Sequence, residues 1–137
     1  MIHEECGVIG IFEGKNIVMI DDSIVRGTTS DKIVSLLRSA GAKEVHMRVS
    51  APPFKFPCFF GTDIDSQENL IACRFPTVSE IGRKIGVDSL GYLEIEDVHK
   101  IAENACCEFC DGCFSGHYPA ETPKVTQKNK FEDKIHK

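Results

Sequence analysis

A nearly all-apolar run and a second strand-like segment lie on either side of a stretch with helical periodicity. The first run, NIVMI at 16–20, predicts a strand that is buried on both faces, as in a parallel sheet covered by helices. From Thr28 the apolar residues recur at helical spacing, and Gly41 lies where a helix C-cap glycine belongs. The run at 43–50, KEVHMRVS, predicts a second strand. This order of strand, helix and strand predicts a βαβ unit with parallel strands.

The helix expected from Thr28 has one apolar side. Its apolar residues are spaced by three or four positions, which predicts that they pack against the sheet. They are Ile33, Leu36, Leu37 and Ala40, and either Thr29 or Ser30 is expected to cap the start of the helix.

The remaining patterns are shorter. They predict strands at 6–12, 69–75 and 89–93, helices at 77–86 and 94–105, and an aromatic-rich loop at 54–65. The last helix is expected to direct inward Val98, Ile101, Ala102 and Ala105. Together the elements predict an α/β fold in which helices flank a parallel sheet.

The composition restricts the partners that the chain can have. It has 137 residues, 42% of them hydrophobic and 27% charged, which is typical of one globular domain. The formal net charge of −5 argues against general binding to nucleic acid or to a membrane surface, and so favours small-molecule partners. No apolar run approaches the ~20 residues of a membrane span, and the first residues lack the pattern of a secretory signal. We therefore expect a cytoplasmic location.

Two adjacent carboxylates, Asp21 and Asp22, follow the first predicted strand directly. The carboxyl ends of parallel strands are where open α/β sheets bind ligands. Gly27 allows a tight turn, and the N-terminus of the next helix can bind phosphate through its free N–H groups and partial positive charge. Thr28, Thr29 and Ser30 add hydroxyl donors. This combination favours a sugar phosphate, with the acids accepting from ribose hydroxyls.

Two other interpretations of the acidic pair remain open. The carboxylates could simply cap the helix, or they could bind Mg²⁺ for phosphotransfer as in a receiver domain. The GxxxxGK[ST] spacing of a Walker loop is missing, so a nucleotide-binding loop of that kind is excluded.

A family resemblance extends this interpretation. IVMIDDSIVRGTTS at 17–30 resembles the phosphoribosyl-pyrophosphate loop of type I phosphoribosyltransferases, in the version found in glutamine phosphoribosylpyrophosphate amidotransferases of purine biosynthesis. The similarity continues through LLRSAGAKEVHMRVSAPP, PCFFGTDID, NLIACRF, VSEIGRKIGVDSLGYL and CFSGHYP, and covers residues 15 to about 119. The resemblance implies part of a Rossmann-like phosphoribosyltransferase sheet.

The resemblance also implies roles for the residues of the loop. Asp21 and Asp22 would hold the ribose hydroxyls and a Mg²⁺ ion shared with the pyrophosphate. The remaining substrate-binding residues would surround the 5′-phosphate: Ser23, Val25, Arg26, Gly27, Thr28 and Thr29. The implied substrates are phosphoribosyl pyrophosphate and glutamine.

The segment HEECGVIGIF at 3–12 is similar to the start of the same family, whose glutaminase uses a cysteine exposed by removal of a propeptide. That cysteine would be Cys6, with Met1 to Glu5 removed. A thiol is a strong nucleophile near neutral pH, and a free α-amino group can act as its base. A Cys-Gly that is merely structural is the alternative.

The chain departs from the family between these two matches. Most of the glutaminase domain and the first half of the transferase domain lie there in the family, and here only residues 13–15 do. The resemblance thus divides the chain into a glutaminase remnant at 1–13, the C-terminal part of a phosphoribosyltransferase domain at 14–119, and a polar tail at 120–137. A nucleophile without its oxyanion hole is expected to be a weak catalyst.

Seven cysteines in a chain without an export signal favour thiol chemistry or metal binding over disulfides. Cys107, Cys110 and Cys113 repeat at a spacing that lets thiolates surround one metal centre. The resemblance implies a [4Fe–4S] cluster bound by Cys58, Cys107 and Cys110, and the family's fourth ligand has no counterpart here. Cys113, Cys106 or Cys73 could substitute for it, and zinc or metal-free thiols remain alternatives.

Three functions follow from these observations. The first is an amidophosphoribosyltransferase that converts glutamine, phosphoribosyl pyrophosphate and water to phosphoribosylamine, pyrophosphate and glutamate. The second is a ribose-phosphate-binding protein without turnover, and the third is a small iron–sulfur or zinc module. An open sheet edge encourages self-association, so we also expect a homo-oligomer.

Overall fold

The computed structural model describes residues 10–62, 64, 66–101, 105–107 and 109–122. None of the helices within these residues has the length and apolar character needed to cross a membrane. The elements in chain order are β1 (Asn16–Asp21), α1 (Thr28–Ser39), β2 (Glu44–Val49), a 3₁₀ turn η1 (Gln67–Asn69), α2 (Ile71–Arg74), α3 (Val78–Ile85), β3 (Ser89–Tyr92), α4 (Ile95–Ile101) and α5 (Gly112–Ser115).

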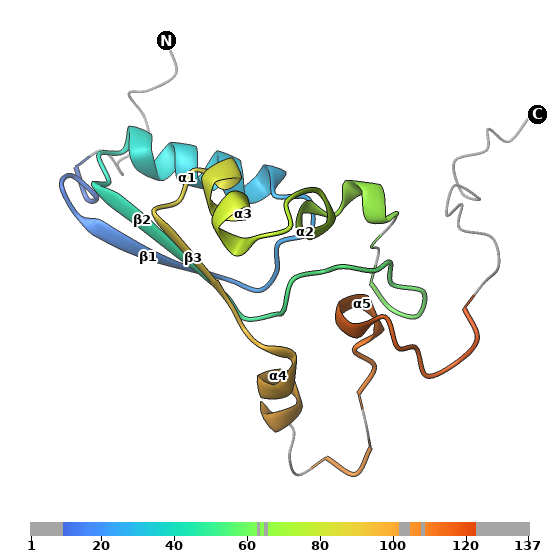
Figure 1. The fold of residues 1–137 in the computed structure, drawn as a ribbon. Helices are drawn as coiled ribbons and strands as arrows, with labels where there is room; N and C mark the ends of the chain where they lie inside the picture. Colours follow the sequence, from blue (N-terminus) through green and yellow to red (C-terminus); the bar gives the residue numbers. More distant parts are fainter. Residues whose placement is uncertain (1–9, 63, 65, 102–104, 108, 123–137) are drawn as a thin grey trace, which may run out of the picture.

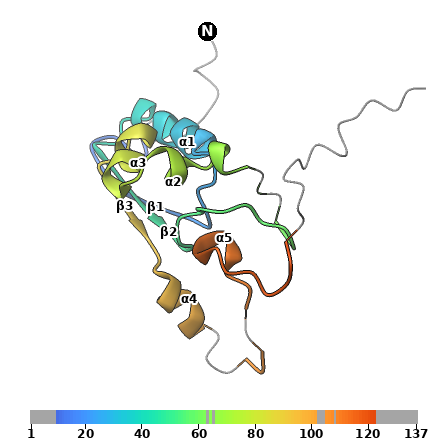
Figure 2. The same ribbon diagram turned by 45° about the vertical axis from the view of Figure 1, so that its right-hand side comes forward.

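The three strands form one parallel sheet in the order β1-β2-β3, which confirms the predicted α/β class and βαβ unit. Asn16 is paired with Glu44 at the start of β1, and Asp21 with Val49 at its end. Helices α1, α2 and α3 lie on one side of the sheet (Figure 1), and the view turned by 45° keeps them there (Figure 2). The carboxyl ends of all three strands therefore lie at one rim.

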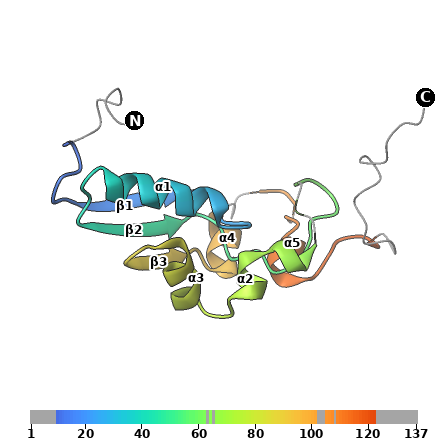
Figure 3. The ribbon, with the colours of Figure 1, turned by 90° about the horizontal axis from the view of Figure 1, so that it is seen from above.

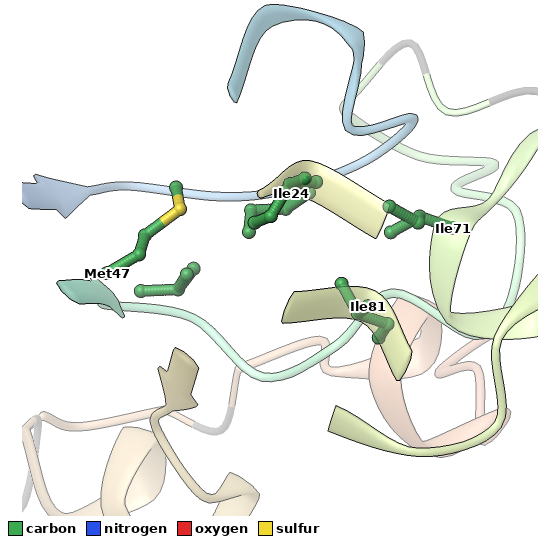
Figure 4. Close-up of a cluster of buried hydrophobic side chains, with 6 residues drawn as sticks. Ile24, Met47, Ile71 and Ile81 are labelled. Atoms are coloured by element: carbon green, nitrogen blue, oxygen red, sulfur yellow. The ribbon is translucent and has the colours of Figure 1, made fainter. Parts of the chain in front are cut away.

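The core lies between β2 and the helices. Figure 4 shows its centre, where Met47 of β2 lies near Ile24, Ile71 and Ile81. A second cluster packs α1 on the sheet through Val34 and Val45. Burial of a large aliphatic side chain stabilises a fold by about 1.5–3 kcal/mol, so these contacts hold the helices on the sheet.

The end of α1 is fixed by backbone geometry and by one arginine. Gly41 has a φ of 90°, and the N–H groups of Gly41 and Ala42 donate to the carbonyls of Arg38 and Leu37, as in a Schellman motif. The Arg38 guanidinium donates to the Lys43 and Gly86 carbonyls and to the Asp88 carboxylate at 2.6 Å. The structure confirms Gly41 as the terminating glycine.

One predicted strand is absent from the described residues, and another is described only in part. Residues 69–75 contain the end of η1 and the helix α2, because a short apolar run has no period that separates strand from helix. The helical turn lets the neighbours Leu70 and Ile71 enter two different apolar clusters. For the predicted strand at 6–12, residues 10–12 form a turn and a bend, and the others lie outside the described residues.

Two predicted buried faces are exposed. The side chains of Val18 and Ile20 on β1 are 63% and 76% exposed, so only one face of this strand is covered. On α1 the buried residues are Ser30 and Val34, whereas Leu36 is 65% exposed. The helix is thus rotated from the predicted orientation, because Val34 rather than Ile33 fits against Val45.

The described part of the helix predicted at 94–105 is α4, and it does not direct Ile101 inward. Helix α4 ends at Ile101, whose side chain is 75% exposed, and residues 102–104 lie outside the described residues. The predicted helix at 77–86 and strand at 89–93 are confirmed as α3 and β3, within one residue at each end. A threonine–glutamate capping box at Thr77 and Glu80 fixes the start of α3.

Replacing Ile81 by alanine should lower the free energy of unfolding by about 2–5 kcal/mol, because this α3 side chain is only 2% exposed. The same replacement at Ile101 should change it by less than about 0.5 kcal/mol. Denaturant unfolding of both variants checks the pair. Equal losses would contradict the burial difference between α3 and α4.

Candidate functional site

The predicted ligand-binding loop forms a cavity at the carboxyl rim of the sheet. A hollow of about 510 Å³ is lined by ten consecutive residues, from Asp21 at the end of β1 to Ser30 in the first turn of α1. The set includes every loop residue that the sequence analysis selected: Asp21, Asp22, Ser23, Val25, Arg26, Gly27, Thr28 and Thr29. The fold therefore brings the candidate acids and the helix N-terminus to one hollow.

The acidic end of the hollow is held by short-range hydrogen bonds. The Asp21 carbonyl accepts from the Ser50 backbone N–H at 3.0 Å and from its hydroxyl at 3.2 Å, which ties the end of β1 to the end of β2. The Asp22 N–H donates to the Asp21 carboxylate at 3.0 Å, and the Ser23 hydroxyl donates to the Asp22 carboxylate at 2.9 Å. Both carboxylates keep further acceptor capacity for a ligand.

The other end of the hollow is the N-terminus of α1. The N-cap residue is Gly27, and no side chain makes a capping hydrogen bond, so the prediction that Thr29 or Ser30 caps the helix is wrong. The cap lies two residues before Thr29 because Gly27 adopts a φ of 81° and its carbonyl accepts from the Asp31 N–H. The first-turn N–H groups, which no side chain caps, can bind an anion.

The loop is fastened to the core beneath it. A Cβ atom on Gly27 would lie 2.5 Å from the Ile71 side chain and 3.3 Å from that of Ile85. Ile24 is buried in the same cluster, and the Ile71 N–H donates to the Val25 carbonyl at 2.8 Å. Thus α2 and α3 support the loop from below and fix the direction of its backbone.

The sequence analysis missed these supporting residues. Ile71 was assigned to a strand, and Ser50 received no role, because neither has a chemical signal of its own. The buried Ser30 was noted only as a hydroxyl donor. Their contribution arises from packing between segments that are distant in sequence.

Three of the candidate cysteines, Cys58, Cys110 and Cys113, are near enough for their charges to interact. Cys58 and Cys113 pack against an apolar cluster that contains Phe54, Ile64 and Leu70. Burial, followed by the negative charges of Cys58 and Cys110, raises the pKa of the Cys113 thiol to about 11. The Lys55 and Phe56 N–H groups both donate to the Cys113 carbonyl, so the loop after β2 and helix α5 are connected here.

Cys107 occupies a different position from the other two predicted sulfur ligands. It is exposed and borders a hollow of about 670 Å³ together with Cys110, His99 and His117. Among the described residues no three cysteine, histidine or acidic side chains are close enough to hold one metal ion. Thiolates are the ligands that iron–sulfur clusters require, but the described thiols are not arranged as a complete ligand set. Cys6 lies outside the described residues.

Comparison with known proteins gives relatives along most of the chain. It is 52% identical over 121 residues to the amidophosphoribosyltransferase of Synechocystis sp., and 48% identical over 118 residues to that of Bacillus subtilis. These matches cover 88% and 83% of this chain but 24% and 25% of the relatives. The chain therefore spans about a quarter of the length of the curated relatives that it matches. No family model matches the chain.

A solved structure agrees with the sequence relatives. Glutamine phosphoribosylpyrophosphate amidotransferase from B. subtilis, in complex with ADP and GMP, superimposes with a TM-score of 0.77 at 47% identity. The match covers 88% of this chain and 27% of the solved one. The three-stranded sheet and its flanking helices therefore have the Rossmann-like phosphoribosyltransferase fold.

Replacing Gly27 by alanine should lower the free energy of unfolding by about 1–3 kcal/mol, since φ is positive and the new methyl group meets Ile71. Gly61 has open space around it and is the control, with an expected change below about 0.5 kcal/mol. Thermal and denaturant unfolding measure both. A Gly27 variant as stable as the parent would show that the loop does not rest on the core.

Proposed function

On the premise that this chain is homologous to part of the amidophosphoribosyltransferases, we propose that its loop from Asp21 to Ser30 binds the ribose 5-phosphate end of phosphoribosyl pyrophosphate. The observation that carries the proposal is the single hollow that joins two carboxylates to an uncapped helix N-terminus. The helix end of the hollow suits the 5′-phosphate, and the acidic end suits the ribose hydroxyls.

The phosphate fits the end of the hollow formed by α1. Backbone N–H groups of Thr28 and Thr29, together with their hydroxyls, supply donors, and the partial positive charge of the helix favours the anion. Gly27 admits the ligand close to the backbone because it has no side chain. The absence of a side-chain cap supports this role, since an occupied cap would compete with the ligand.

The ribose fits the acidic end. Asp21 and Asp22 accept hydrogen bonds from ribose hydroxyls, and these bonds to charged acceptors fix the orientation of the sugar. A Mg²⁺ ion at this end would supply charge neutralisation of the leaving pyrophosphate. Mg²⁺ is commonly held by one or two carboxylates plus substrate phosphates, so two adjacent acids are a suitable protein contribution.

The complete reaction requires more residues than this chain contributes. We propose that the family protein transfers glutamine-derived ammonia to C1 of the ribose and releases pyrophosphate and glutamate, with Cys6 as the glutaminase nucleophile. The part described here supplies binding and orientation of the phosphoribosyl group. Binding without turnover is therefore the activity expected of the 137-residue chain alone.

Several partners and properties stay predictions. Glutamine as the second substrate, a homo-oligomeric state and the absence of nucleic-acid and membrane partners rest on the sequence analysis. The cytoplasmic location also rests on the sequence analysis. One relative, which is 50% identical over 128 residues, is a chloroplastic enzyme of Arabidopsis thaliana.

Calorimetric titration with phosphoribosyl pyrophosphate and Mg²⁺ tests the proposed binding. The double substitution Asp21→Asn and Asp22→Asn should weaken the affinity at least tenfold, because hydrogen bonds to charged acceptors contribute about 1.5–3 kcal/mol each. Glu68→Gln with Glu121→Gln removes the same charge at two exposed positions away from the loop, and should leave the affinity unchanged. Equal affinity of the parent and the loop variant would refute the proposal.

Cys113 is a better third sulfur ligand than Cys107 for the predicted [4Fe–4S] cluster. Cys58 and Cys113 pack against the same apolar cluster, and the charges of Cys58 and Cys110 act on Cys113. We therefore propose Cys58, Cys110 and Cys113 as the sulfur ligands that this chain supplies, and derive no step of the reaction through the cluster. Four thiolates complete such a cluster, so a fourth ligand must come from elsewhere.

Anaerobic reconstitution with iron and sulfide tests this ligand set. A visible charge-transfer band should form in the parent chain and should be lost or reduced in Cys113→Ser. The variants Cys107→Ser and Cys73→Ser should keep the band, because neither residue is among the three proposed ligands. Loss of the band in Cys107→Ser with retention in Cys113→Ser would restore the ligand set that the resemblance implied.

A further inference from the structure

Ser30 differs from the other hydroxyl residues of the ligand loop because it is buried. It is only 3% exposed, and within the described residues no other polar or charged residue is buried to this degree. The neighbouring Thr28 and Thr29 are exposed. A buried hydroxyl group normally has a hydrogen-bond partner, so the partner of this one needs to be identified.

The Ser30 hydroxyl has no hydrogen-bond partner in the part of the chain that the structure describes. Ser39 and Ser115 donate to the carbonyl four residues earlier, at 2.9 and 3.3 Å. Ser30 makes no such bond, and the residue four positions before it lies outside the helix. Among the described side-chain oxygens and nitrogens, only the Tyr92 hydroxyl is both inaccessible and without a partner. The Ser30 oxygen therefore keeps access to open space.

That open space is the hollow at the carboxyl rim, because Ser30 is one of its lining residues. The Cα–Cβ bond of a helical residue is tilted toward the N-terminus of its helix, so the Ser30 side chain is directed toward the loop. Ser30 also lies on the same face of α1 as Val34, which is one turn further along and packs on the sheet. Figure 3 shows the first turn of α1, in blue, beside the loop that follows β1. The hydroxyl therefore points between the loop and the end of the sheet.

The backbone N–H of Ser30 is a second available donor. The first helical hydrogen bond of α1 runs from the Asp31 N–H to the Gly27 carbonyl, so the N–H groups of Thr28, Thr29 and Ser30 precede the helical bonds. No side chain caps them. Ser30 thus brings one backbone donor and one side-chain donor to the same end of the hollow.

We propose that Ser30 is a further phosphate-binding residue, whose hydroxyl donates to a terminal phosphate oxygen on the side of the anion that faces the sheet. The inference rests on the proposed binding of a ribose 5-phosphate, and Ser30 is not among the substrate-binding residues that the resemblance implied. Successive helical residues are about 100° apart, so Thr28, Thr29 and Ser30 approach the helix axis from three directions. Two exposed donors and one buried donor then meet the three terminal oxygens of a phosphate monoester.

Burial gives Ser30 a different energetic role from that of the exposed threonines. Thr28 and Thr29 must be ordered when they bind a ligand, whereas surrounding atoms already restrict the Ser30 side chain. A buried hydroxyl without a partner lowers the stability of the chain without ligand, and a bound phosphate supplies the missing partner. Ser30 is therefore expected to favour ligand binding while contributing nothing to the stability of the free protein.

The variant Ser30→Ala tests this role, because its affinity should fall while its stability does not. Calorimetry on the 137-residue chain should show about tenfold weaker binding of ribose 5-phosphate, since a hydrogen bond to a charged acceptor is lost. The thermal unfolding midpoint should equal or exceed that of the parent, because alanine removes an unpartnered hydroxyl and has the higher helix propensity. Ser35→Ala makes the same change at an exposed position of α1 and should leave the affinity unchanged.

Inorganic phosphate, titrated by phosphorus NMR, locates the contact at the phosphate end of the hollow. Ser30→Ala should weaken binding of this anion by a similar factor. The double variant Asp21→Asn and Asp22→Asn should not weaken it, because the change removes negative charge.

The outcomes separate this inference from the proposed function. A Ser30→Ala variant that binds both ligands as the parent does overturns the role of Ser30 alone. So does a variant that loses affinity and stability together, because a structural role then explains the loss. A parent chain that binds neither ribose 5-phosphate nor phosphate refutes the proposed function, and the role of Ser30 with it.

Discussion

The contact between Gly27 and the side chains of Ile71 and Ile85 is the constraint on which the site depends. A Cβ atom at Gly27 would come within 2.5 Å of the Ile71 side chain, so the loop after β1 lies directly on the core. This contact starts α1 at Thr28 with its N-terminus unobstructed by a side chain. The acidic end of β1 and the start of the helix consequently face one hollow, and binding geometry follows from core packing.

The two faces of the sheet differ in burial at β1. The helix-covered side contains the core and holds the ligand loop through Ile24 and Ile71. The other side of β1 exposes Val18 and Ile20, so the stability of the monomer does not come from that surface. A chain that matches a quarter of its relatives' length thus contains a complete βαβ unit.

The spacing of the cysteines in the sequence and their positions in the fold suggest different sets of metal ligands. Their repeat at 107, 110 and 113 indicated a metal or thiol site, but cannot decide which sulfurs converge. The fold brings Cys58, from the loop after β2, toward Cys113 in α5, and leaves Cys107 exposed. The spacing of the cysteines therefore did not identify the one that packs in the same apolar cluster as Cys58.

The sequence by itself determined the βαβ unit, the extent of β2 and α3, and the contiguous residues that line the hollow at the carboxyl rim. These follow from local periodicity, turn chemistry and a motif whose residues are contiguous. Only the tertiary structure decided which face of α1 is buried, that residues 69–75 are helical, and that Gly27 rather than a hydroxyl residue begins the helix. Each of these depends on contacts between distant segments, and a local pattern contains no information about the partner that a side chain will meet.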